Sequence, residues 1–138
     1  MSDAWQEALM AEYAAIFAYG VVGVQLSAGA ADQARAVEAA HRARRDMLVL
    51  RAAGASQVPV DPAYQTPFPV TDAASALRLA AEVEERCAAV WRAVLPVSTG
   101  EERETALDAL VEYAVNATRW RLTAGITPAV PTWPGLPG

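Results

Sequence analysis

Apolar residues recur at steps of three and four over most of this chain, which is the spacing of helices that bury one face. Proline and glycine interrupt this pattern and divide it into segments, because neither residue is favoured inside a helix. The segments predict four helices at residues 3–28, 32–53, 72–95 and 99–124. We therefore expect an all-α protein, a four-helix bundle formed by residues 1–125.

Two segments lack the helical pattern. Residues 54–71 contain four prolines, and a connection of this length is uncommon in a compact domain unless it has a task. An extended chain of this composition covers about 3.1 Å per residue, enough to run the length of the bundle. We expect one long crossover between the second and third helices, as in ferritin-like folds. The alternative is an up-down-up-down bundle in which this segment is a long loop at one end. The proline-rich tail at 126–138 is expected to be extended and to pack on the bundle.

Three of the predicted helices carry an ionisable residue in the middle of their apolar face, namely Glu12, His41 and Glu84. A charged group that is buried without a partner is strongly unfavourable, so something inside the bundle must satisfy these side chains. The face predicted for the fourth helix contains no acid. It comprises Leu107, Leu110, Val111, Ala114 and Thr118.

One way to satisfy the buried acids is a metal ion. Glu38 and His41 lie three positions apart and project from one side of the second helix. Together with Glu12 and Glu84 they would offer carboxylate oxygens and an imidazole at a common depth, the donor set of a carboxylate-bridged metal centre. The first hypothesis is therefore a degenerate centre that either binds one transition metal, iron or manganese, weakly or no longer binds any. If the protein were an enzyme, it would be a non-haem metal oxidoreductase, but His41 is the only histidine, and a complete di-metal site needs a second Glu-x-x-His.

The second hypothesis needs no metal. Arg44 and Arg45 follow His41 by about one helical turn, and a guanidinium at the centre of the bundle would neutralise the buried acids directly. Glu112 of the fourth helix is a further candidate for this ion-pair network. The resulting protein would be a non-catalytic, dimeric structural or interaction module without a cofactor.

Composition narrows the function classes. A net charge of −5 and a pI of about 4.8 argue against nucleic-acid binding, which requires a basic face. The uncharged, largely apolar run at 13–24 is shorter than the roughly 20 residues that cross a bilayer, so no membrane span is expected. Cys87 is the only cysteine, which excludes an internal disulfide and fits a cytoplasmic protein.

Segments 11–23, 40–46 and 68–72 resemble an uncharacterised, alanine-rich ferritin-like family of high-GC bacteria. The resemblance extends over nearly the whole chain. It implies a ferritin-like four-helix fold and a homodimer, and it implies no activity, because the family is itself of unknown function. Members often carry His where this chain has Tyr13, so the resemblance also implies that one metal donor is absent here.

Overall fold

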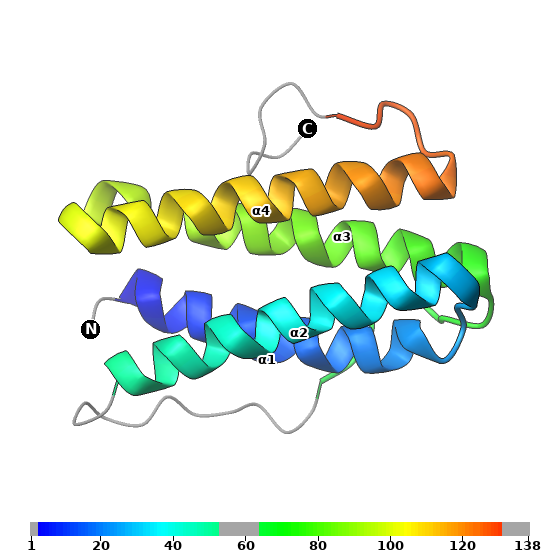
Figure 1. Ribbon diagram of the computed structural model, residues 1–138, viewed down its shortest axis with the longest axis horizontal. Helices are drawn as coiled ribbons and strands as arrows, with labels where there is room; N and C mark the ends of the chain where they lie inside the picture. The colour runs from blue at the N-terminus through cyan, green and yellow to red at the C-terminus, as the bar shows by residue number, and fades with distance from the viewer. Residues whose placement is uncertain (1–2, 53–63, 131–138) are drawn as a thin grey trace.

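The computed structural model describes residues 3–52 and 64–130, and every regular element in these ranges is helical (Figure 1). The elements are α1 (Asp3–Gly23), α2 (Ala28–Arg51), α3 (Ala73–Arg92), the short 3-10 helix η1 (Leu95–Val97) and α4 (Gly100–Ala124). α1 packs against α2 and α3, and α3 packs against α4. The prediction of an all-α four-helix bundle is confirmed. Within the described ranges, no helix has the length and hydropathy of a membrane span.

The direction of the helices agrees with the expected crossover. In Figure 1, α1 and α2 run antiparallel, as do α3 and α4, whereas α2 and α3 run in the same direction. The end of α2 and the start of α3 therefore lie at opposite ends of the bundle, and the chain that joins them must cover its length. Part of this connection, residues 53–63, lies outside the described residues, as does the tail at 131–138 whose packing on the bundle was expected.

Several helix ends differ from the prediction. α1 ends at Gly23 and not at residue 28, because the chain turns there, with Gln25 N donating to Val22 O at 3.1 Å. α2 then begins at Ala28, four residues before the predicted start, after an extended Ser27. α3 stops at Arg92 and not at residue 95, and the chain continues into η1, which contains a proline that cannot extend the helix.

The predicted buried face of α4 is wrong at Leu107 and Val111, whereas Leu110 is half-buried and packs against the core. Leu107 and Val111 are 49% and 55% exposed. The face that packs inward is instead rich in alanine and aromatic residues: Ala106, Ala109, Tyr113, Asn116, Ala117 and Trp120. Alanines let α4 lie close to α3, and the two large rings fill the remaining space. An apolar stripe thus remains on the outside of α4.

The core consists of two hydrophobic clusters along the bundle axis. One surrounds Trp5 and Trp91, and the other surrounds Tyr19, Leu79 and Trp120. On α2 and α3 the buried residues of the two clusters are separated by buried polar residues. The positions predicted from the sequence to interrupt the apolar faces therefore share one level in the middle of the bundle.

Candidate ion-paired site in the bundle core

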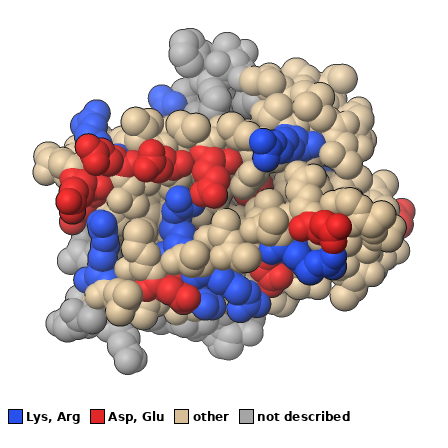
Figure 2. All heavy atoms as spheres, viewed as in Figure 1, with Lys and Arg blue, Asp and Glu red and all other residues tan. Residues whose placement is uncertain are grey.

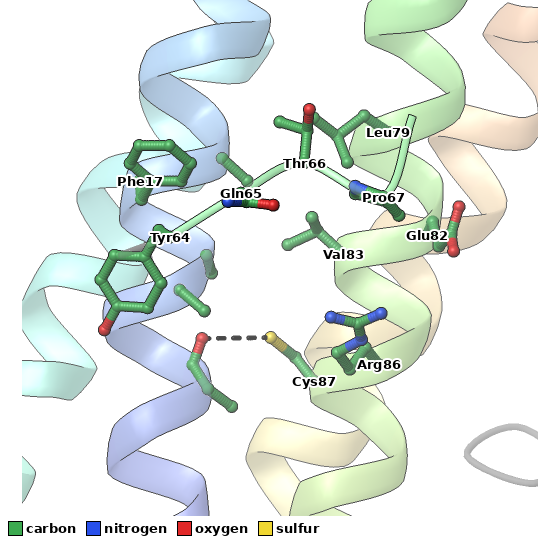
Figure 3. Close-up of a pocket in the computed structure, with 14 residues that line it drawn as sticks. Phe17, Tyr64, Gln65, Thr66, Pro67, Leu79, Glu82, Val83, Arg86 and Cys87 are labelled. Atoms are coloured by element: carbon green, nitrogen blue, oxygen red, sulfur yellow. Dashed lines mark hydrogen bonds between the residues drawn. The ribbon is translucent and has the colours of Figure 1, made fainter. Parts of the chain in front are cut away.

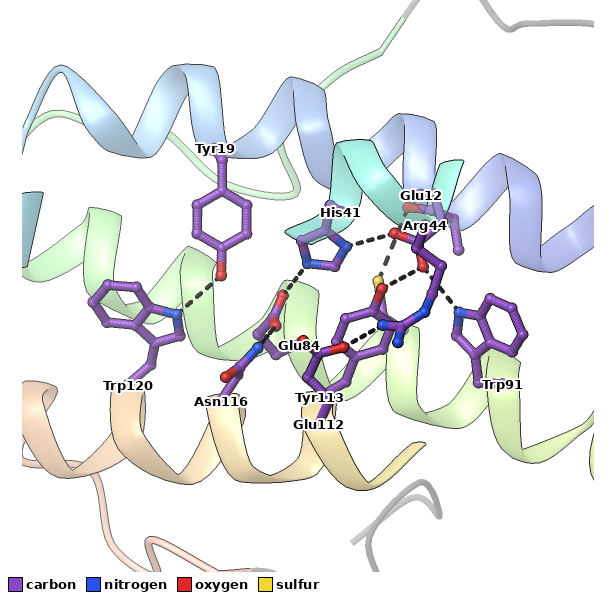
Figure 4. Close-up of polar contacts among 12 residues, drawn as sticks. Glu12, Tyr19, His41, Arg44, Glu84, Trp91, Glu112, Tyr113, Asn116 and Trp120 are labelled. Carbon is purple, nitrogen blue, oxygen red and sulfur yellow. Dashed lines mark hydrogen bonds and ion pairs between the residues drawn. The ribbon is translucent and has the colours of Figure 1, made fainter. Parts of the chain in front are cut away.

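Three helices bring an ionisable side chain to this central level. Glu12 of α1, His41 of α2 and Glu84 of α3 are all fully buried, with 0% exposure. The imidazole lies between the two acids, with Nδ1 2.6 Å from Glu12 Oε2 and Nε2 2.7 Å from Glu84 Oε2 (Figure 4). The prediction that these three residues converge is confirmed. We call Glu12, His41 and Glu84 the buried triad.

The other oxygen of each carboxylate is also satisfied. Trp91 Nε1 donates to Glu12 Oε1 at 3.0 Å, and the Tyr113 hydroxyl donates to the same oxygen at 2.5 Å. Asn116 Nδ2 donates to Glu84 Oε1 at 2.8 Å. All four carboxylate oxygens of the triad therefore accept a hydrogen bond, which is the condition under which buried carboxylates are tolerated.

The triad holds a proton on His41. Burial by itself would lower the pKa of His41, but the hydrogen bonds and charges of Glu12 and Glu84 outweigh it and raise this pKa from 6.5 to about 9. At neutral pH the ring is an imidazolium that donates from both nitrogens. It is the buried cation between the two acids.

Aromatic rings enclose the imidazolium. Tyr113 stacks on His41 with ring centroids 4.6 Å apart and an interplanar angle of 15°, and the Tyr19 ring lies 5.7 Å away. Trp120 Nε1 donates to the Tyr19 hydroxyl at 2.9 Å. Burial, reinforced by the charge of Glu84, raises the pKa of Tyr19, and burial together with Glu12 does the same for Tyr113. Both phenols therefore remain protonated; the Tyr113 hydroxyl donates to Glu12, and the Tyr19 hydroxyl accepts from Trp120.

The arginines predicted to neutralise the buried acids lie at the edge of this site. Arg44 forms an ion pair with Glu112, and its guanidinium lies 5.1 Å from the centre of the Tyr113 ring. Arg45 bonds the neighbouring Asp46 at 2.9 Å and lies over the ring of Tyr13. Neither arginine has an ion pair with the triad, so the neutralising role expected of them belongs to His41. The Arg44–Glu112 pair joins α2 to α4 beside the triad.

The structure does not bring Glu38 into the triad. Its side chain is 25% exposed, and its carboxylate accepts from Arg42 at 3.0 Å on the surface of α2. The i, i+3 spacing from His41 fixes only the approximate side of the helix. An accessible arginine one turn further on is the partner that the carboxylate takes.

The donor set of the triad, in its present geometry, does not fit a metal ion. Over residues 3–52 and 64–130, no group of three His, Cys, Asp or Glu side chains is arranged to hold one. A histidine ligand must be neutral and must direct a nitrogen lone pair at the metal. Both nitrogens of His41 instead face carboxylate oxygens at hydrogen-bond distance.

Three donors of this site were not identified from the sequence: Trp91, Tyr113 and Asn116. A usable signal existed for the last two. Tyr113, Asn116 and Trp120 recur at steps of three and four on α4, which places their polar groups on one face. Reading the aliphatic residues of α4 as its buried face concealed that pattern.

Comparison with known proteins gives a family and a similar crystal structure, and neither description names a function. The family described as "Domain of unknown function (DUF4439)" matches residues 4–138, nearly the whole chain. The chain belongs to this family. A crystal structure of a conserved hypothetical protein, rv2844, from Mycobacterium tuberculosis is similar at 36% identity and a TM-score of 0.82, covering 87% of this chain and 93% of that one. No curated protein matches. The resemblance to an uncharacterised family of high-GC bacteria is thereby confirmed.

Proposed function

We propose that this member of the family is a non-catalytic structural or interaction module, a homodimeric, ferritin-like bundle whose core charges pair with one another. The observation that supports this most strongly is the double hydrogen bonding of His41, which leaves neither nitrogen free for a metal or a substrate. A general acid or base must reach the reacting atom, and the His41 side chain has no exposed surface. The parallel course of α2 and α3, with one long crossover, supports the ferritin-like assignment. The buried thiol of Cys87 fits a reducing cytoplasm.

The second candidate is the metal centre at Glu12, Glu38, His41 and Glu84. One observation favours it: two carboxylates and an imidazole meet at one level of the bundle. Iron or manganese would have to displace the His41 proton and one hydrogen bond. Elemental analysis of protein purified without chelator, followed by anaerobic Fe(II) titration, separates the two candidates. Stoichiometric metal would overturn the ion-paired module, whereas a trace amount and no uptake support it.

For the homodimer we propose the outer face of α4 as the interface. Leu107, Val111, Val115 and Leu122 follow one another at helical spacing and are 49%, 55%, 43% and 66% exposed. We call these four residues the α4 stripe. An apolar row of this kind on a helix that already buries its opposite face is typical of an interaction surface. Acidic side chains gather over the first half of α4 in Figure 2, with basic ones toward its other end.

The charges beside the stripe favour a second copy in antiparallel orientation. Asp108 and Arg119 are exposed, and neither forms an ion pair with another described residue. They lie eleven positions apart, which is about three turns and about 16 Å along one side of the helix. A two-fold axis midway between them places Asp108 of each copy opposite Arg119 of the other. The interface would then be isologous, with two reciprocal ion pairs.

Charge exchange tests this arrangement. Asp108→Arg and Arg119→Asp should each weaken the dimer by about tenfold, because like charges then face each other twice. The double variant should restore it. Glu7→Arg on α1, at an exposed position, is the control for net charge. Sedimentation velocity over a concentration series gives the dissociation constants. A monomeric wild-type protein, or single variants that dimerise like wild type, would refute this interface.

A further inference from the structure

A hollow lies between α1 and α3, away from the α4 stripe and the Arg44–Glu112 pair. The wall on α1 is formed by Ala11, Ala14, Ala15 and Ala18, four methyl groups at steps of three and one on a single face. The hollow encloses about 60 Å³, so it accommodates only a small ligand, part of which stays outside the enclosed space. Longer side chains at these alanines would fill the space, so the hollow follows directly from the sequence of α1.

A segment that precedes α3 closes one side of the hollow (Figure 3). The Tyr64 ring stacks on Phe17 of α1 with centroids 5.4 Å apart, and Phe68 lies under the guanidinium of Arg78 of α3 at 4.1 Å. The Thr66 hydroxyl donates to the Phe68 carbonyl at 2.8 Å and stiffens the turn between these two anchors. The segment is thus attached to both helices, and the hollow lies beneath it.

The remaining surfaces of the hollow are apolar except at the rim. Leu79 and Val83 form the α3 wall, and Cys87 lies at the far end, where its thiol Sγ is 3.9 Å from the Ala11 carbonyl. Burial and the nearby acids of the triad raise the pKa of this thiol, so it stays neutral and apolar. An apolar hollow of this kind favours an apolar occupant, because its lining atoms otherwise lack contacts on one side.

The rim carries a cation. Arg86 is exposed, lines the hollow and forms no ion pair or hydrogen bond with any other residue that the structure describes. In Figure 3 its guanidinium lies on the side of the hollow, whereas the carboxylate of Glu82, one turn earlier, points away from it. A guanidinium presents two parallel donors that match a carboxylate.

We propose that this hollow binds a small apolar carboxylate, with its hydrocarbon part along the α1 alanines and its anionic group on Arg86. The site depends on neither the dimer nor the metal content of the triad. It differs from the triad in accessibility, since the exposed Arg86 is part of its lining. The ligand class is an aliphatic or aromatic acid of a few carbon atoms beyond the carboxylate.

Three compounds of one shape test the proposal: benzoate, benzyl alcohol and benzylammonium. Each is titrated into ¹⁵N-labelled protein to about millimolar concentration while amide shifts are followed. Benzoate should give saturable shifts at Ala14, Ala15 and Val83, and it should bind more tightly than the alcohol, with the cation weakest. No saturable shift with any compound, or shifts confined to other residues, would overturn the site.

Two variants and a control separate the roles of charge and space. Arg86→Gln should weaken benzoate binding by about threefold, as expected of a partly exposed ion pair, and should leave benzyl alcohol unaffected. Ala14→Leu, at a half-buried position, should abolish binding of both compounds by filling the hollow. Arg35→Gln, which removes an exposed arginine of α2 that does not line the hollow, should change neither. Equal binding of benzoate to wild type and Arg86→Gln would overturn the anionic ligand class. This comparison of wild type with Arg86→Gln can still be made if the Ala14→Leu variant does not fold.

Discussion

The proton on His41 makes the stability of the bundle depend on pH in a direction set by the triad. The pKa of His41 is raised from 6.5 to about 9 in the folded protein. A raised folded-state pKa stabilises the fold fully below the unfolded value and loses that contribution as pH rises through the folded value. At about 1.4 kcal/mol per pKa unit, a shift of this size corresponds to about 3 kcal/mol. We expect about 2 kcal/mol of it to be lost between pH 6.5 and 8.5.

Urea unfolding at a fixed protein concentration measures this loss directly. The thiol of Cys87 also has a raised pKa and acts in the same direction, but only above about pH 8.5, where the unfolded thiol ionises. Cys87→Ala should therefore leave the slope below that pH unchanged, whereas His41→Gln should remove it. Because His41 is the only histidine, its ring carbon signal also reports the pKa without ambiguity. A free energy of unfolding that is flat over this pH range, or a midpoint near 6.5, would refute the reasoning.

Three substitutions test the packing and hydrogen bonds around the triad by urea unfolding. Glu84→Gln should destabilise the protein by about 2–4 kcal/mol and lower the pKa of His41, because the buried imidazolium loses a charged partner. The same change at Glu38, on the surface, should cost less than about 0.5 kcal/mol. Equal losses of stability in the two variants would contradict the geometry of the triad. Tyr113→Phe keeps the ring stacked on His41 and removes a donor to the buried carboxylate of Glu12, so it should lower the free energy of unfolding by about 1.5–3 kcal/mol. An unchanged stability would mean that the Tyr113–Glu12 hydrogen bond is absent. Gly125→Ala should cost about 1 kcal/mol, because φ is +72° at this helix end, and a neutral result would argue against the left-handed cap.

The fold and the depth of the triad were predictable because both follow from periodicity. Helical spacing places Glu12 and Glu84 near the centres of their buried faces. The short turns from α1 to α2 and from α3 to α4, and a crossover as long as the bundle from α2 to α3, then keep the centres of the helices at one level. The direct partner of the acids was not predictable in the same way. The side-chain lengths and rotamers of His41 and Arg44 decide which cation reaches the middle, and spacing alone does not distinguish two candidates one turn apart.

Which face of α4 is buried could not be predicted from hydrophobicity, for a related reason. Leu107 and Val111 are more hydrophobic than Ala106 and Ala109, so a pattern based on transfer energies buries the wrong side. Close packing against α3 favours the alanines, and the carboxylate of Glu12 favours the face that carries the Tyr113 hydroxyl. Both requirements come from another helix and are absent from the local sequence.

A metal ion would have to compete with the proton on His41 for the carboxylates of the triad. Removing this proton at neutral pH, with a pKa of about 9, costs about 3 kcal/mol before any metal–ligand bond forms. Tyr13 belongs to a separate contact, in which its ring lies 5.9 Å from the guanidinium of Arg45. The two hydrogen bonds of His41 are therefore the contacts that a metal ion would first have to displace to reach these carboxylates.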